Sequence, residues 1–125
     1  MLNNLHAAQQ ALELAETPND VTQALQHLLV SHIEGAIFDI VLETNGTEIK
    51  QPTIDAKGLK ITVPLVVGIN VYGHVTGKNS EAFTQSELAI ILAQSTIAAI
   101  RLDRLSWPAS PLVFHQLAEI GRAHV

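Results

Sequence analysis

The stretch from Gly58 to Leu105 reads GLKITVPLVVGINVYGHVTGKNSEAFTQSELAIILAQSTIAAIRLDRL, and it decides the fold. Its first part alternates apolar and polar residues with a period of two, which predicts a half-buried strand. Gly68 permits a chain reversal, and a second run rich in β-branched residues follows it. The apolar residues of these two predicted strands are Leu59, Ile61, Val63 and Leu65, then Ile69, Val71, Tyr72 and Val75.

A long, almost wholly apolar helix is predicted after this hairpin. Thr84 stands three residues before Glu87 and just ahead of the apolar run, which is the pattern of a capping box. In that motif the hydroxyl accepts a hydrogen bond from one unpaired amide and the carboxylate accepts one from another. Because Pro108 disfavours helical geometry in the residue before it, we expect a helix from about Gln85 to Ser106.

Two further helices are predicted at the start of the chain. Apolar residues at three- and four-residue spacing predict a first helix from Leu2 to about Glu16. A second helix follows, with Asn19 or Asp20 as its expected N-cap and Gly35 closing it in the left-handed conformation. Their apolar faces comprise Leu2, Leu5, Ala8, Leu12 and Ala15 in the first helix, and Val21, Leu25, Leu28, Leu29 and Ile33 in the second.

Two more strands are predicted between these helices and the hairpin. Residues 36–43 are predicted as a strand with Ala36, Phe38, Ile40 and Leu42 on one face, and the dipeptide Asn45-Gly46 after them is a strong signal for a type I′ hairpin turn. We therefore expect this strand to pair with a weaker one over residues 48–54. Pro52 lacks a ladder donor, which favours an edge position or a bend. The fold class is α+β: an antiparallel sheet with the N-terminal helices and the long C-terminal helix on one face.

These motifs resemble those of a GAF domain over roughly residues 5 to 105. GAF domains are small sensory and dimerisation modules of signalling proteins, so the resemblance implies a regulatory role without catalysis. It rests on Val63-Pro64-Leu65, a glycine turn, Val71-Tyr72-Gly73, Phe83-Thr84, Glu87-Leu88, and a helix end at Ile97-Ala98-Ala99-Ile100 followed by Arg104-Leu105.

The functional marks of known GAF branches are absent from this sequence. Bilin-binding members and GAF-type methionine sulfoxide reductases work through cysteines, and the chain has none. The Asn-Lys…Phe…Asp-Glu pattern of cyclic-nucleotide-binding members is reversed at Lys78-Asn79, and Phe83 is followed by Glu87-Leu88. The segment from Gln51 to Gly58 is too short for the helix that roofs the pocket in ligand-binding members. We therefore expect no cofactor, and no bilin or cyclic-nucleotide ligand.

The composition excludes other classes of function. Hydrophobic residues make up 47% of the 125 residues and charged residues 15%, the balance of a globular domain. The net charge of −5, with seven scattered Lys and Arg residues, argues against a nucleic-acid partner. The sequence shows neither a leader nor an apolar span long enough for a membrane helix, and lacks a disulfide framework. We expect a cytoplasmic protein with no membrane partner.

No pattern of residues indicates catalysis or metal binding. His27 and His32 are five residues apart, which points them about 140° apart on a helix, whereas a metal pair needs a spacing of four. Asp39 and Glu43 share one face of the first strand, but acid–base chemistry needs two groups brought together in a cleft. We therefore predict that the chain is not an enzyme and has no metal site.

The chain divides into three parts. Residues 1–106 form the predicted GAF-like domain, and residues 107–118 form a linker or the start of a further segment. Residues 119–125, EIGRAHV, resemble a translated sequencing adapter. We expect these last residues to lie outside the fold, and the natural protein to continue past about Ala118 into an output domain.

The long helix carries two apolar stripes, on opposite sides. A helix that is apolar on both sides must be buried on both. The first stripe has the 3-4-3-4-3 spacing of a coiled-coil seam, and we predict it as the interface of a homodimer; the alternative is that the domain's own sheet and helices cover it. We thus expect a module for dimerisation and signal relay, with a small-ligand sensor as the alternative. The first stripe comprises Leu88, Ile91, Ser95, Ala98, Leu102 and Leu105, and the second Ile90, Ala93, Ile97 and Ile100.

Overall fold

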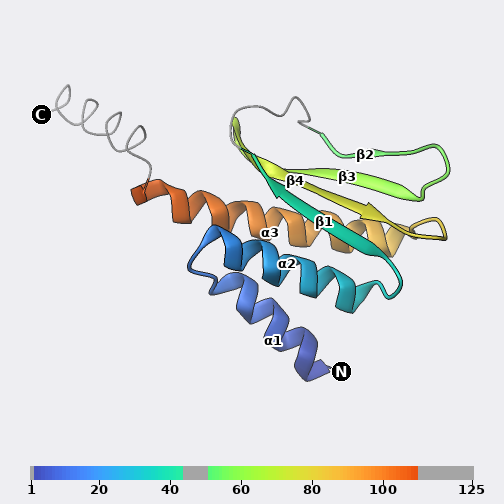
Figure 1. Cartoon of the computed structure of the whole chain (residues 1–125), viewed down its shortest axis with the longest axis horizontal. Coiled ribbons are helices and arrows are strands. Elements are labelled where there is room, and N and C mark those ends of the chain that lie inside the picture. Colours follow the sequence, from blue (N-terminus) through green and yellow to red (C-terminus); the bar gives the residue numbers. More distant parts are fainter. Residues whose placement is uncertain (1, 44–50, 110–125) are drawn as a thin grey trace, which may run out of the picture.

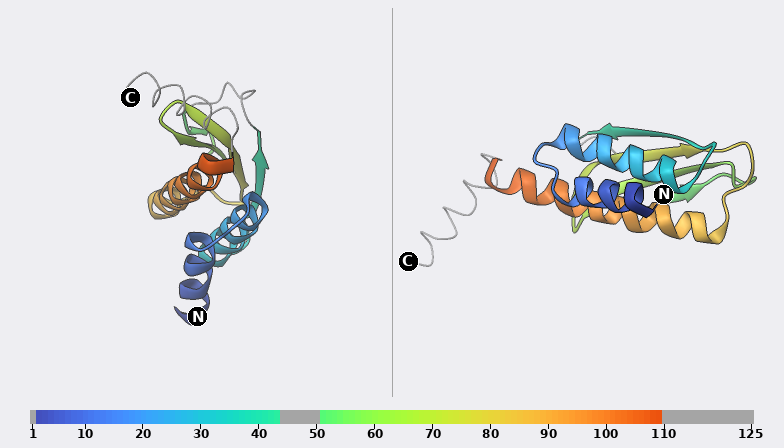
Figure 2. Two further views of the ribbon diagram at one scale, coloured as in Figure 1. Left: turned by 90° about the vertical axis from the view of Figure 1, so that its left-hand side faces the viewer. Right: turned by 90° about the horizontal axis from the view of Figure 1, so that it is seen from below.

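The computed structural model describes residues 2–43 and 51–109. It has a four-stranded antiparallel sheet with helices on one face, which confirms the predicted α+β class (Figure 1). Helices α2 and α3 lie against the sheet, and α1 packs on them (Figure 2). The elements are α1 (Leu2–Glu13), α2 (Pro18–His32), β1 (Ile37–Leu42), β2 (Thr53–Ile54), β3 (Lys60–Val67), β4 (Asn70–Lys78) and α3 (Gln85–Ala109).

The strand order is β1-β4-β3-β2, so the first two strands of the chain occupy opposite edges of the sheet. The prediction that β1 pairs with β2 is therefore wrong, and Asn45-Gly46 lies outside the described residues. β1 instead pairs with β4 along its whole length, from Ile37↔Lys78 to Leu42↔Gly73. The edge position inferred from Pro52 is confirmed, because among the described residues β2 pairs with β3 alone.

Two glycines explain why β1 fits against β4. A Cβ atom at Gly73 would lie 2.0 Å from the carbonyl oxygen of Val41, and one at Gly77 would lie 2.6 Å from the Phe38 ring. Gly73 also has a φ of 150°, which L side chains rarely adopt. β4 therefore lacks side chains at the points where β1 approaches most closely. The pairing depends on this fit between distant segments, which a local turn signal does not encode.

The predicted hairpin of β3 and β4 is confirmed. Gly68 has a φ of 62° in the turn, and Val63 pairs with Val75 in the middle of the two strands. A register shift between Leu65 and Val66 leaves Tyr72 as an additional residue on β4. The alternation also holds, because the side chains that face the helices are buried: Ile61, Val63, Leu65 and Val75.

Helices α1 and α2 form where the apolar spacing predicts them, but the end of α1 and both ends of α2 differ. α1 ends at Glu13, three residues before the predicted end. Thr17 caps α2, and not Asn19 or Asp20, because Thr17 Oγ1 accepts a hydrogen bond from the Asp20 amide at 3.1 Å. Pro18 takes the first helical position, where a backbone N–H would make no hydrogen bond within the helix, so its absence costs nothing.

The connection from α2 to β1 also differs from the prediction. α2 ends at His32 with Ile33 as its C-cap, so Gly35 does not close the helix. Gly35 has a φ of 85° in the turn that follows. Beyond it the predicted alternation holds at the start of β1, where Phe38 is buried and Ile37 is exposed, but at its end Leu42 is exposed like Val41.

α3 begins at the predicted capping box. The Thr84 amide donates to Glu87 Oε1 at 2.8 Å, and the Glu87 amide donates to Thr84 Oγ1 at 3.1 Å. The helix continues to Ala109 and thus passes the end predicted at Ser106. Pro108 lies in the last turn, where it removes one backbone donor without interrupting the body of the helix.

One hydrophobic core lies between the sheet and the helices. The described helices include none that is long and apolar enough to cross a membrane. The largest fully buried apolar side chains are Leu12, Val21, Leu25, Leu28, Leu29, Ile33, Phe38, Leu65, Val75 and Ile91.

Candidate functional site

The stripe of α3 predicted as a dimer interface faces the protein's own core. Four of its six residues are buried, and Leu88 and Leu105 are partly buried and pack against the same core. α3 presents this side to the sheet and to α2. The stripe is therefore covered within a single chain, which favours the alternative that the domain's own sheet and helices pack on it. The four buried residues are Ile91, Ser95, Ala98 and Leu102.

The second apolar stripe divides between core and solvent. Ile90 and Ile97 are partly buried and pack against the core, whereas Ala93 and Ile100 are exposed. Together with neighbouring exposed residues they form what we call the exposed stripe of α3: Ala89, Leu92, Ala93, Thr96 and Ile100.

The exposed stripe is apolar in character along its whole length. The exposed fraction is 38% for Leu92 and 41% for Ile100. Thr96 is its only residue with a polar side chain, and the Thr96 hydroxyl donates to the Leu92 carbonyl of the same helix at 2.9 Å. Ala89, Ala93, Thr96 and Ile100 follow a 4-3-4 spacing, which lines them up on one side of a helix. The stripe could therefore pack against another helix.

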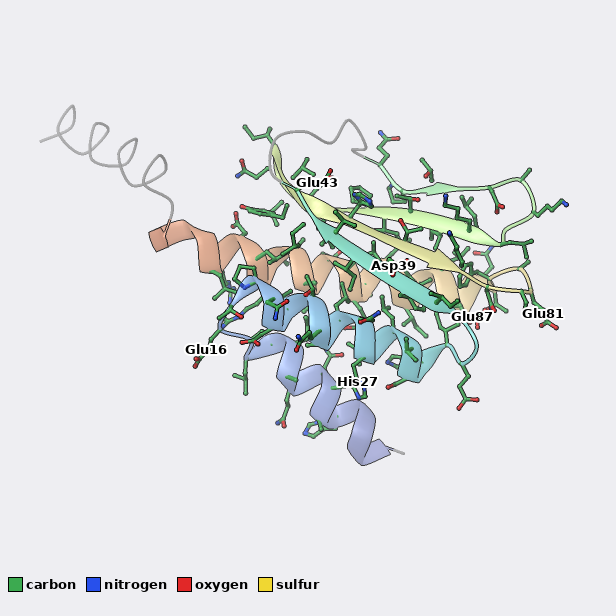
Figure 3. All side chains as sticks on the ribbon, viewed as in Figure 1. Glu16, His27, Asp39, Glu43, Glu81 and Glu87 are labelled. Carbon is green, nitrogen blue, oxygen red and sulfur yellow. The ribbon has the colours of Figure 1, made fainter. Side chains whose placement is uncertain are left out.

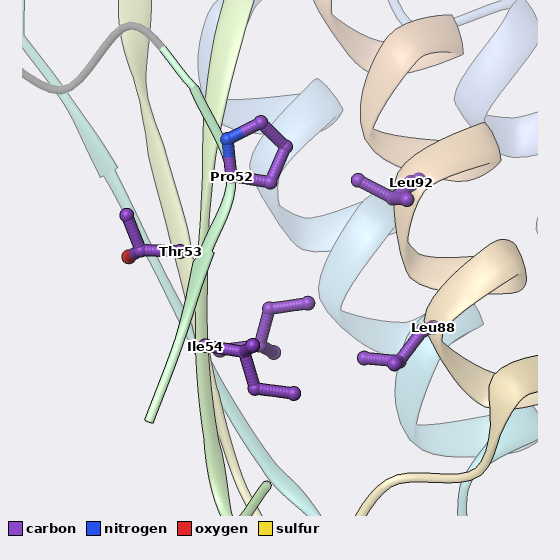
Figure 4. Close-up of a pocket in the computed structure, with 6 residues that line it drawn as sticks. Pro52, Thr53, Ile54, Leu88 and Leu92 are labelled. Carbon is purple, nitrogen blue, oxygen red and sulfur yellow. The ribbon is translucent and has the colours of Figure 1, made fainter. Parts of the chain in front are cut away.

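A groove lies beside this stripe, between β2 and the first turns of α3. Its volume is about 170 Å³, and it is lined almost entirely by apolar atoms. In Figure 4, Pro52 and Ile54 on one wall point towards Leu92 and Leu88 on the other, whereas the Thr53 side chain points away. The lining residues are Pro52, Thr53, Ile54, Ile61, Leu88 and Leu92.

Local hydrogen bonds fix both walls of the groove. The capping box between Thr84 and Glu87 fixes the first turn of α3, and Leu88 is the next residue of that helix. On the other wall, Asp55 Oδ1 accepts hydrogen bonds from the amides of Leu59 at 2.7 Å and Lys60 at 3.1 Å. This turn folds β2 back onto β3, so that Ile54 pairs with Ile61. The buried Ile61 lines the groove between the two walls.

Two hydrogen bonds tie the C-terminal half of α3 to other elements. The Tyr72 hydroxyl on β4 donates to the Asp103 carboxylate. Arg101 Nε donates to the Ala15 carbonyl, in the turn between α1 and α2, at 2.7 Å. α3 is thus connected to both the sheet and the N-terminal helices.

The titratable residues that the structure describes lie on different elements of the fold. Glu16, His27, Asp39, Glu43, Glu81 and Glu87 come from different parts of the fold (Figure 3). Asp39 and Glu43 are exposed on the outer face of the sheet, and His27 and His32 are exposed on α2. Across residues 2–43 and 51–109, no group of three His, Asp or Glu side chains is placed to hold a metal ion.

A solved structure shares this arrangement of helices and strands. It is the native GAF domain of the potassium sensor histidine kinase KdpD from Escherichia coli. The two structures match with a TM-score of 0.68 over 90% of this chain and 99% of that one, at 15% sequence identity. This chain has the GAF fold. No protein-family model and no curated protein matches the sequence.

The outer face of this GAF sheet has no helix over it among the described residues. As the sequence predicts, the segment from Gln51 to Gly58 forms no roof helix: it contains only the two residues of β2 and a turn. On this face His74 is partly buried, and its Nδ1 atom is buried without a hydrogen-bond partner among the described groups. The groove lies on the opposite side of the sheet, where the helices pack.

Sequence reasoning missed the groove and misjudged which side of α3 is free. The groove joins Pro52 and Ile54 to Leu88 and Leu92, about 35 positions later in the chain, and no local pattern connects these segments. The sequence gives no local signal for the exposed stripe either, because the buried side of α3 also carries a hydroxyl residue, Ser95, and an alanine, Ala98.

Proposed function

We propose that this chain is a non-catalytic sensory or regulatory module that forms a homodimer through α3 and relays helix movements to a further domain. The observation that carries the proposal is the exposed stripe, since an apolar stripe on a terminal helix is stabilised by packing against a partner helix. The GAF fold shared with a domain of a sensor histidine kinase supports a sensory role. A cytoplasmic setting is part of the proposal, supported by the cysteine-free sequence.

The interface we propose differs from the one predicted from sequence. Because Ile91, Ser95, Ala98 and Leu102 are already buried in the core, a second chain has no access to them. The exposed stripe remains available, and Leu92 and Ile100 supply its largest side chains. Ala89 and Ala93 are small enough to let two helix backbones approach closely.

The size of the stripe predicts a weak dimer. Fully burying one Leu or Ile side chain stabilises by about 1.5–3 kcal/mol, whereas association costs about 4–15 kcal/mol in lost freedom. Leu92 and Ile100 are already more than half covered, so each has only part of this energy left to contribute. We therefore expect the association to be weak.

The two hydrogen bonds on the C-terminal half of α3 support the relay. A displacement of the hairpin or of the α1–α2 turn would reach the helix through Tyr72–Asp103 or Arg101–Ala15. The same helix carries the exposed stripe, so a movement of α3 would also alter how two copies pack.

Sedimentation equilibrium of the wild type and two variants tests the dimer. Ile100→Asp places a charge on the exposed stripe and should give a folded monomer, because burying an unpaired carboxylate is costly. Ile37→Asp is the matched control, since Ile37 is 64% exposed on the outer face of β1, away from α3. The control should dimerise like the wild type. A wild type that stays monomeric at high micromolar concentration contradicts the proposal, and so does equal dissociation of both variants.

A second candidate function, binding of a small ligand, is favoured by the apolar groove between β2 and α3.

A further inference from the structure

We infer that the groove between β2 and α3 is a binding site for a small uncharged hydrocarbon molecule of about six to eight carbon atoms. The inference rests on the second candidate function and deepens it, by naming the site and the class of ligand. It does not depend on the homodimer, because every residue that lines the groove belongs to one chain.

The chemistry of the lining selects the class of ligand. A polar ligand needs side chains that donate or accept hydrogen bonds, and sites for such ligands place a few of them inside an otherwise apolar pocket. Of the described residues that line the groove, Thr53 alone has a polar side chain, and that side chain points away from the groove (Figure 4). A charged or strongly hydrogen-bonding ligand would lose its hydration here without replacement. An uncharged hydrocarbon has no such loss.

The volume sets the size of the ligand. The groove measures about 170 Å³, and an apolar cavity of about 150 Å³ lined by aliphatic side chains is known to accept benzene. Its two walls are also incompletely covered, since Ile54 is 48% and Leu92 is 38% exposed. A hydrocarbon between them would remove apolar surface from water on both walls.

Other occupants fit the groove less well. A peptide strand added to the sheet edge depends on backbone hydrogen bonds, but β2 offers only two residues, and Pro52 before it has no N–H. A second copy of the chain would approach along the exposed stripe, which shares only Leu92 with the groove. The groove therefore suits a small molecule better than a macromolecule.

The position of the site gives it a means of acting on α3. One wall is the two-residue edge strand β2, which pairs with β3, and the other wall is the start of α3. A bound molecule would contact Leu88 and Leu92 on consecutive turns of the helix. Occupancy would thus add apolar contacts between β2 and the first turns of α3.

Titration of the full chain with toluene, followed through the methyl signals of Ile and Leu by NMR, tests the site. Toluene should cause saturable shifts centred on Ile54, Ile61, Leu88 and Leu92. Benzoate, which has a similar shape but carries a charge, should bind at least tenfold more weakly. Shifts spread over the whole core, or equal binding of benzoate, would overturn the proposal.

Variants of both walls locate the binding. Ile54→Gln and Leu92→Gln should each weaken toluene binding at least fivefold, and one variant on each wall keeps the test valid if the other fails to fold. Ile37→Gln and Ile100→Asp are the controls, since both residues are exposed and lie outside the groove. Unchanged affinity in folded forms of both wall variants would refute the site.

The same variants separate this proposal from the dimer. If Ile100→Asp is monomeric and still binds toluene, both proposals stand. If the wild type is a monomer that binds toluene, the dimer fails and the groove stands. A dimer that binds no toluene refutes the groove alone.

Discussion

Leu102 and Ile100 stand two positions apart on α3, and their truncation should have very different effects. Leu102 is 4% exposed in the core, whereas Ile100 is 41% exposed on the stripe. Leu→Ala at a closely packed buried site costs about 2–5 kcal/mol, because it loses transfer free energy and leaves a cavity. Ile100→Ala loses only part of the transfer term and opens no enclosed cavity, so we expect about 1 kcal/mol. The difference between the two variants should therefore be about 2 kcal/mol or somewhat more.

Urea unfolding followed by circular dichroism measures this difference. The protein concentration is kept where the wild type sediments as a monomer, because association would add to the apparent stability. Equal m-values would show that the two variants expose the same surface on unfolding. In thermal unfolding, 1 kcal/mol corresponds to a shift of about 4–8 °C for a domain of this size, so the two melting temperatures should differ by about 10 °C. Equal losses, or a larger loss for Ile100→Ala, would refute the assignment of the two sides of α3.

Two further substitutions test other parts of the fold. Ser95→Ala should raise stability by about 1 kcal/mol in thermal unfolding, because Ser95 Oγ is buried without a hydrogen-bond partner among the described groups, and Ala is the better helix former; a clear loss of stability would show that the hydroxyl has a partner. Gly73→Ala should destabilise by about 3 kcal/mol or more, since its Cβ would meet the Val41 carbonyl oxygen. Gly68→Ala is its control, with positive φ but open space around the Cβ, and should cost about 1–2 kcal/mol; equal effects would contradict the close approach of β1 to β4.

Periodicity predicts the elements of this fold well, because each one carries its own pattern. The alternation from Leu59 to Leu65 specifies β3, and Thr84 with Glu87 specifies the first turn of α3. Such signals involve only neighbouring residues, so a single segment of the sequence contains all the information that they need.

Pairing between distant segments is harder to predict. Asn45-Gly46 indicates a turn, but it does not determine that β1 lies beside β4. Gly73 and Gly77 make room for that pairing, and their role becomes visible only once Val41 and Phe38 are placed against them. The strand order therefore depends on complementarity between segments rather than on the turn.

The candidate site was the least predictable part, for the same reason. Both sides of α3 are apolar in sequence, and the spacing alone does not show which side of the helix faces the core. The coiled-coil spacing from Leu88 to Leu105 marked the side that packs on the sheet, since a core stripe and a dimer seam have nearly the same period.

The central claim is that two copies of this chain meet along the exposed stripe of α3, and a distance between spin labels tests it most directly. The chain has no cysteine, so Thr96→Cys creates one attachment point, near the middle of the stripe and exposed to solvent. Packed helix axes lie about 8–10 Å apart, so pulsed electron paramagnetic resonance should detect a distance below about 25 Å between the labels of two chains. Ser31→Cys on the exposed side of α2 should give a longer distance in the same dimer. A short distance from Ser31 and none from Thr96, or no coupling between chains at high micromolar concentration, would contradict the claim.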